Sequence, residues 1–255
     1  MRITILGCGS SEGVPVLGYG WGDCDKNNPK NFRTRSSIII KTEETSLLID
    51  MSPDLRQQLL LYDSCNVDAV IFTHTHYDHV SGINELRSVF REQNKLLPVY
   101  GTLRDITEIK KKHAYLFERT GHKFYKPYLE SHIIEDKFTI GDISGLCFDQ
   151  NHGFSQSLGI RIGNFAYSTD VVSLSEDNFR FLYGVDTWIV DCVSIKNATQ
   201  THAHLDLVLE WEKEIKPRRV FLTHMGITMD YDTLLHILPE NIKPSYDQME
   251  ITVDR

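Results

Sequence analysis

Thr73-His74-Thr75-His76-Tyr77-Asp78-His79 places three histidines and one aspartate within six positions of this 255-residue chain. The stretch follows directly on the apolar run Val70-Ile71-Phe72, which predicts a buried strand. The polar residues would then lie in the loop where the chain leaves the sheet, and such loops usually present functional groups. Imidazole and carboxylate are ligands that zinc, manganese and iron accept. The stretch therefore predicts a metal site at a strand end.

The alternative for the same stretch is a solvated polar loop whose histidines are satisfied by local hydrogen bonds. Four ligand-type side chains crowded together without a cation would be hard to keep both uncharged and solvated. We therefore favour the metal site over the polar loop.

Short apolar runs on both sides of the stretch predict strands, and helical spacing predicts helices between them. Two β-rich halves with helices outside favour an α/β (α+β) fold of two packed sheets flanked by helices. We expect one domain over residues 1–255, with residues 13–36 as an irregular surface loop. The predicted strands cover residues 2–6, 37–41, 46–50, 69–73, 137–140, 145–149, 158–162, 164–168, 187–191 and 219–223. The predicted helices begin at Ser52-Pro53 or cover residues 80–91, 102–118, 175–182, 205–216 and 231–238.

Composition limits the classes of protein to which the chain can belong. A hydrophobic content of 41% excludes a disordered chain, and no run approaches the ~18 apolar residues of a membrane span. The net charge of −8 disfavours nucleic-acid binding by general phosphate neutralisation. The amino terminus lacks the pattern of a secretory signal, and the five cysteines are scattered. We expect a cytoplasmic protein that does not contact membranes.

Gly7, Gly9 and Gly13 follow the first predicted strand, which raises the question of a dinucleotide-binding loop. The third glycine falls one position late, and Pro15, Gly18 and Gly20 stand where a helix should open. A tight turn is the better interpretation, and it could border an active site on an unrelated fold.

The sequence THTHYDHVSG resembles the H-x-H-x-D-H signature of the metallo-β-lactamase superfamily, a four-layer αββα sandwich with a two-metal site between its sheets. The resemblance implies three further ligands near predicted strand ends, His152, Asp170 and His224. It implies two divalent ions, Mn²⁺ or Zn²⁺, with Asp170 bridging them. By the same resemblance one ion would be held by His74, His76 and His152, and the other by Asp78, His79 and His224.

Rival ligands exist for two of these positions. His122 and His132 compete with His152 but lack a preceding strand and a following glycine. Asp191 also ends a predicted strand and competes with Asp170. We prefer Asp170 for its place in the family pattern and expect Asp191 and Asp50 to orient ligand imidazoles as hydrogen-bond acceptors.

Four segments resemble a narrower group that includes the phosphoribosyl 1,2-cyclic phosphate phosphodiesterase; they are residues 7–15, 31–37, 48–56 and 202–209. The catalytic histidine of that group would fall on His202, with His204 as its rival, and Asp78 joins the catalytic set as a ligand. Characterised relatives carry a cysteine cluster that holds a structural zinc, whereas the corresponding segment here keeps Cys24 alone. We therefore expect no structural zinc.

The resemblance implies a dinuclear phosphodiesterase that hydrolyses a small anionic phosphodiester, cyclic and of phosphoribosyl type. A hydroxide shared by the metals would attack phosphorus, and the metals would neutralise the charge that builds on the phosphoryl oxygens. His202 would protonate the departing oxygen. Arg33 and Arg35 are candidates to bind a terminal phosphate of the substrate through paired hydrogen bonds.

Other functions remain open at this point. A ribonuclease of the tRNA 3′-end processing type shares the ligand pattern but usually needs a basic arm, and Lys110-Lys111-Lys112 is only a short run. A glyoxalase II-like thioester hydrolase is less favoured, because the residues that follow His224 are too few for its helical substrate domain. A β-lactamase is disfavoured by Asp170, and a metal-binding protein without catalysis is weakly disfavoured by His202 and His204. The sequence does not determine the oligomeric state, and a homodimer is a candidate assembly because relatives of the narrower group are often dimers.

Overall fold

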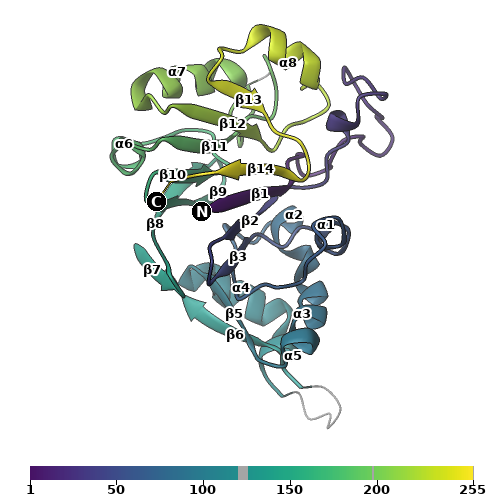
Figure 1. The fold of residues 1–255 in the computed structure, drawn as a ribbon, viewed down its shortest axis with the longest axis vertical. Coiled ribbons are helices and arrows are strands. Elements are labelled where there is room, and N and C mark those ends of the chain that lie inside the picture. Colours follow the sequence, from purple (N-terminus) through teal and green to yellow (C-terminus); the bar gives the residue numbers. More distant parts are fainter. Residues whose placement is uncertain (120–125, 197, 255) are drawn as a thin grey trace.

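The computed structural model of the chain describes residues 1–119, 126–196 and 198–254. Two seven-stranded sheets pack against each other, and helices cover the outer face of each (Figure 1). The predicted arrangement of two packed sheets flanked by helices is therefore confirmed. Among the described ranges, no helix is both long and apolar enough to cross a bilayer.

The first sheet has the strand order β14-β1-β2-β3-β4-β5-β6. From β14 to β3 the neighbours pair antiparallel, and from β3 to β6 they pair parallel. Its last strand in the sequence, β14, lies at an edge beside the first strand, β1. The strands are β1 (Arg2–Gly7), β2 (Ser37–Lys41), β3 (Ser46–Ile49), β4 (Ala69–Ile71), β5 (Leu97–Gly101), β6 (Leu129–Ile133) and β14 (Met249–Thr252).

The second sheet has the order β13-β12-β11-β10-β9-β8-β7 and repeats the style of the first. Strands β7 to β10 form an antiparallel meander, and β10 to β13 pair parallel. The strands are β7 (Lys137–Ile140), β8 (Ile143–His152), β9 (Ser155–Ile162), β10 (Phe165–Ser168), β11 (Thr187–Asp191), β12 (Arg219–Thr223) and β13 (Ile242–Pro244).

The helices divide between the two outer layers in sequence order, as Figure 1 shows. The first layer holds α1 (Leu55–Leu61), α2 (Tyr77–Val80), α3 (Leu86–Gln93), α4 (Leu103–Lys112) and α5 (Ala114–Phe117). The second layer holds α6 (Glu176–Leu182), α7 (Leu205–Ile215) and α8 (Tyr231–Ile237). Short 3₁₀ helices cover Pro29–Asn31 and Ser81–Glu85.

Strand β2 shows why the central strands are apolar along their whole length. Ile38 and Ile40 belong to the apolar cluster between the sheets, whereas Ile39 belongs to the cluster beneath α1 to α5. Successive side chains of a strand point to opposite faces, and both faces of this sheet are covered. All three isoleucines are fully buried, so this strand carries apolar residues on both faces.

The structure corrects several predicted boundaries. The first helix begins at Leu55 rather than at Ser52-Pro53, and the predicted helix 80–91 is a 3₁₀ turn followed by α3. The predicted helix 102–118 is broken at His113, whose φ of −130° is not helical. Strands β5, β6, β13 and β14 were not predicted: Pro98 interrupts the apolar run of β5, and the other three show no long apolar run.

Candidate active site

The predicted ligands all lie at or just after the carboxyl ends of strands. His74 to His79 follow β4, and the last two of these four ligands lie on the short helix α2. His152 is the last residue of β8, Asp170 stands two positions after β10, and His224 directly follows β12. Strand ends of this kind share one edge of each sheet, which brings residues distant in the sequence together. Seven side chains thus meet at the seam between the sheets.

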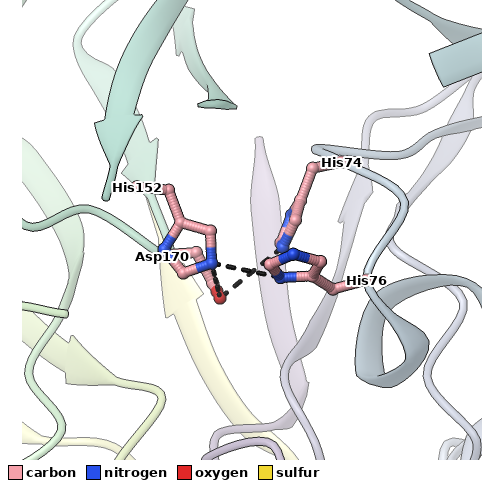
Figure 2. Close-up of side chains that lie close together, drawn as sticks. All are labelled: His74, His76, His152 and Asp170. Carbon is pink, nitrogen blue, oxygen red and sulfur yellow. Dashed lines mark hydrogen bonds and ion pairs between the residues drawn. The ribbon is translucent and has the colours of Figure 1, made fainter. Parts of the chain in front are cut away.

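A first cluster joins His74, His76 and His152 with Asp170, as Figure 2 shows. His152 Nε2 lies 3.1 Å from His76 Nδ1 and 3.5 Å from Asp170 Oδ2. His74 Nε2 lies 3.7 Å from the same carboxylate oxygen. Only His76 is exposed, so the cluster is open to solvent on that side.

A second cluster joins Asp78, His79 and His224 with the other oxygen of Asp170. His79 Nε2 lies 3.2 Å from Asp78 Oδ2 and 3.1 Å from Asp170 Oδ1. His224 Nε2 lies 3.3 Å and 3.6 Å from these two oxygens. Within each cluster the donor atoms lie within 4.8 Å of one another, and Asp170 offers one oxygen to each.

Hydrogen bonds behind the clusters fix the orientation of two imidazoles. Asp50 Oδ2 lies 2.7 Å from His79 Nδ1, and Asp50 Oδ1 accepts a hydrogen bond from the Thr73 amide. His152 Nδ1 lies 2.7 Å from the Thr201 carbonyl, which can only accept a hydrogen bond. Both rings therefore carry a proton on Nδ1 and turn Nε2 towards the clusters. Asp50 takes the orienting position expected from the sequence.

Three residues of the site hold a left-handed backbone. The φ angles are 64° at Asp50, 52° at Asp170 and 56° at His224. Aspartate and histidine adopt this region more readily than most residues, yet each such position costs on the order of 1–3 kcal/mol. Strain of this kind is typical of functional sites, where the surrounding structure holds the residue in place.

Burial and neighbouring charges set the protonation states of the ligand side chains. Burial lowers the pKa of His74 and of His152, so both imidazoles are neutral near pH 7. Burial opposes ionisation of Asp170, but the neighbouring His224 and His79 hold its pKa well below the usual range. Burial opposes the protonated form of His79, but the carboxylates of Asp170, Asp78 and Asp50 raise its pKa well above the usual range. His74 and His152 are thus already neutral, as metal ligands must be, whereas a metal ion at the second cluster would have to displace the Nε2 proton of His79.

His202 lies beside the second cluster, held by an aspartate. Its Nδ1 is 3.0 Å from Asp191 Oδ2, and its ring stacks on His224 at 4.5 Å between centroids. Burial opposes the protonated form, but Asp191 and other carboxylates raise the pKa of His202 to about 9. His204 instead forms the amino-terminal cap of α7 and contributes to none of the clusters formed by the described residues. Of the two rivals, His202 is the one that the structure brings to the site.

The structure places Arg33 and Arg35 in networks of their own. Arg33 is 1% exposed and donates to Asn31 Oδ1 and the Cys24 thiol, which holds it inside the 13–36 segment. Arg35 pairs with Asp54 at 3.0 Å. These contacts give Arg33 a structural role in this conformation, because a buried guanidinium is closed to a substrate.

The 13–36 segment is irregular as predicted, but it is not simply a surface loop. It packs against the segment before α8, where Asn31 donates to Asp230 and Asp23 donates to the Ile227 carbonyl. Gly9 pairs with Met225 on one side and Arg35 on the other, and a side chain at Gly9 would collide with the Arg33 carbonyl. The glycines thus allow close backbone approach beside the site, and no dinucleotide loop forms there.

His132 and His122 were the rival candidates for the position of His152. His132, a rival for His152, stacks on Tyr100 in the first sheet, and His122 lies outside the described residues. The contacts of Thr201 with His152, and of Asp191 with His202, join residues far apart in the chain. No local sequence pattern identifies Thr201 as a partner of His152. Asp191 was predicted to orient a ligand imidazole; it holds the imidazole of His202 instead, and its other oxygen lies 3.8 Å from Nδ1 of the ligand His224.

Comparison with known proteins gives one family match and several similar chains. The model of the beta-lactamase superfamily domain matches residues 45–225, which is more than half of the chain. An octanoyltransferase of Porphyromonas gingivalis is 28% identical over 257 residues, covering 100% of this chain and 52% of the relative. The chain therefore spans about half the length of that curated relative.

Two solved structures resemble the chain along almost its whole length. A crystal structure described as a new diphosphatase from the PhnP family has a TM-score of 0.90 and 26% identity, with 98% of this chain and 97% of that chain covered. Zn²⁺-bound PqqB from Methylobacterium extorquens has a TM-score of 0.79 at 18% identity, covering 99% and 100% of the two chains, and shows the shared fold alone.

Proposed function

Because the chain belongs to the beta-lactamase superfamily, we propose that it is a metal-dependent hydrolase of small organic phosphates. The observation that carries the proposal is the convergence of seven ligand-type side chains in two clusters that share Asp170. A carboxylate that offers one oxygen to each of two clusters is suited to two adjacent cations.

The donor atoms fit divalent ions of the zinc or manganese type. The buried Nε2 atom of His74 has no hydrogen-bond partner, which is costly for a polar atom unless a ligand satisfies it. Imidazole with carboxylate is a ligand set that both metals accept. His74, His76 and His152 would hold one ion, Asp78, His79 and His224 the other, and Asp170 both. Such ions supply activation of water and stabilisation of negative charge on a phosphoryl group.

The remaining side chains manage a proton. Asp191 fixes His202 through Nδ1, which leaves the other ring nitrogen to donate a proton. A pKa of about 9 keeps the imidazole protonated at neutral pH. His202 would therefore protonate the departing oxygen of the substrate, and Asp191 would stabilise its charged form.

The substrate class follows from likeness and charge. The similar crystal structure is described as a diphosphatase, and the sequence resembles a group that acts on a cyclic phosphodiester. A chain with a net charge of −8 can still present a cationic centre when two divalent ions are bound. We therefore propose a small phosphodiester or diphosphate, with a cyclic phosphoribosyl-type ester as the first candidate.

The test is hydrolysis by the purified protein after chelation and after restoration of Mn²⁺ or Zn²⁺. The substrates are bis(p-nitrophenyl) phosphate, a ribose cyclic phosphate, a nucleoside diphosphate and a precursor tRNA. We expect activity on at least one small phosphate, lost on chelation and restored by metal. Cleavage of the precursor tRNA with no small-phosphate turnover would favour the ribonuclease alternative.

A second candidate is hydrolysis of an acyl thioester, favoured by the name of the relative from Porphyromonas gingivalis. That name describes a protein about twice the length of this chain, so it does not assign the acyl activity to the half that this chain matches. Octanoyl-coenzyme A added to the same panel separates the candidates. Thioester turnover without phosphate turnover would contradict the main proposal.

A further inference from the structure

The turn formed by residues 199–202 touches both a cluster histidine and the candidate proton donor. The carbonyl of Thr201 accepts the hydrogen bond from His152 Nδ1 at 2.7 Å. The next residue, His202, is held by Asp191 through its own Nδ1. The rings of His152 and His202 lie edge to face with centroids 4.9 Å apart. One short stretch of backbone therefore sets two groups of the site at once.

The hydroxyl of Thr199 organises this turn. Thr199 Oγ1 accepts hydrogen bonds from the amides of His202 at 2.8 Å and Thr201 at 3.4 Å, and it donates to the His202 carbonyl at 3.0 Å. A hydroxyl offers one donor and two acceptor lone pairs, so this group uses its full capacity inside the turn. Removing it would release two amides and one carbonyl together.

The two ends of the turn are anchored unequally. Downstream, the Ala203 carbonyl accepts from the Val193 amide at 2.9 Å, and Ala203 is fully buried. Upstream, Thr199 and Gln200 are exposed to solvent. The exposed end of the turn thus depends on the Thr199 hydroxyl for its shape.

The β8–β9 hairpin packs closely against the turn at Gly153. Gly153 directly follows His152 and has a φ of 70°. A Cβ atom there would lie 2.4 Å from the Gln200 carbonyl oxygen, which leaves no room for a side chain. The hairpin and the turn therefore fit together only with glycine at this position.

We propose that Thr199 is a positioning residue. Its hydroxyl fixes the turn so that the Thr201 carbonyl meets His152 Nδ1 and the backbone of His202 holds the imidazole against Asp191. The inference rests on the proposed function for the role of His202. The part that concerns His152 depends only on metal binding. Groups that orient a metal-binding histidine typically change metal affinity or activity by about 10–100-fold when removed.

The decisive variant is Thr199→Val, which keeps the shape of the side chain and removes the hydroxyl. We expect it to weaken the binding of one of two metal equivalents by about 10–100-fold and to leave the binding of the other unchanged. The reason is that His152 belongs to the first cluster only. The kcat should fall with little change in KM, and Thr199→Ser should restore both properties. Zn²⁺ titration against a chromophoric chelator gives the affinities, and the rates come from the phosphate substrate that the wild type cleaves.

Thr139→Val is the matched control, because its hydroxyl makes an exposed hydrogen bond with Ser144 on the β7–β8 hairpin. Gly153→Ala is a second probe, expected to weaken the same metal equivalent by displacing the turn from the hairpin side. Wild-type affinity for both equivalents and wild-type kcat in Thr199→Val would overturn the inference. A wild type that cleaves no phosphate would overturn the proposed function instead, and the metal titration would still decide the role of Thr199.

Discussion

The two sheets supply the site in different ways. The first sheet delivers His74, His76, Asp78 and His79 from a single loop after β4. The second sheet delivers His152, Asp170 and His224 from the ends of three strands, 18 and 54 residues apart in the chain. The first set is a local motif, whereas the second exists only when the sheet has assembled.

Backbone conformation follows the same division. None of the residues from His74 to His79 has a positive φ; the left-handed residue on this side is Asp50, which is not a ligand but accepts the Thr73 amide hydrogen bond. Asp170 and His224 both hold left-handed backbones that cost on the order of 1–3 kcal/mol each. The second set is thus more strained and depends more on its surroundings. Variants that act on one set or on both can test this contrast.

The largest effect is expected from Asp170→Asn, because this residue serves both sets. Asparagine tolerates the left-handed backbone, so the fold should survive. The neutral amide can no longer offer an anionic oxygen to each cluster. We expect loss of at least one metal equivalent and a fall in kcat/KM beyond the ~100-fold of an orienting group. Metal analysis and steady-state kinetics measure both.

Asp177→Asn is the control for Asp170→Asn, since it removes a carboxylate from an exposed ion pair on α6. It should leave metal content and kinetics unchanged. Two tightly bound metals and near-native activity in Asp170→Asn would show that the clusters do not depend on a shared carboxylate.

Intermediate effects are expected from two single variants, Asp50→Asn and Asp191→Asn. The first removes the carboxylate that orients a metal ligand, and the second removes the carboxylate that holds the candidate proton donor. Asp50 holds His79 and the Thr73 amide, so its variant should lower metal affinity by about 10–100-fold. Asp191 holds His202 and the Val171 amide, so its variant should lower kcat mainly and retain both metals. Chelator competition and kcat on the best substrate give the two readouts. Equal loss of metal from both variants would show that Asp50 and Asp191 do not have different roles.

The smallest effect on the site is expected from Asp247→Asn. Asp247 accepts hydrogen bonds from the Cys8 amide and the Thr34 amide and hydroxyl. The Cys8 carbonyl in turn accepts from Met225, the neighbour of His224. Cys8 and Met225 thus lie between Asp247 and His224, and the Asp247→Asn variant should change kcat little.

The effect of Asp247 on stability should instead depend on pH. Burial raises its pKa from 3.8 to about 6, so between these values the folded protein binds more protons than the unfolded chain. The contribution of Asp247 to the free energy of unfolding therefore falls as pH rises through this window. Asp247→Asn lacks this penalty and should gain up to about 3 kcal/mol relative to the wild type between pH 4 and pH 7. Urea unfolding of both proteins at four pH values measures it, and parallel curves would contradict the prediction.

The contrast between the sheets also explains which features of the fold and the site could be predicted from the sequence. The loop after β4 was visible as a dense local pattern, and the two-sheet fold followed from alternating apolar runs. His152, Asp170 and His224 came from a family resemblance, because single residues at strand ends carry no local pattern. Hydrogen bonds such as that from Leu158 to the Thr73 carbonyl, which joins the sheets beside the loop, depend on tertiary structure alone.

The position of β14 has a consequence for the order in which the chain can fold. Strand β14 pairs with β1 at the edge of the first sheet (Figure 1). Met1 and Val253 exchange backbone hydrogen bonds at 3.0 Å and 2.9 Å. Until that strand emerges from the ribosome, β1 is an open sheet edge, and Cys8 and Thr34 lack the carboxylate of Asp247. The first sheet is therefore begun with β1 and completed only when β14 is available to pair with it.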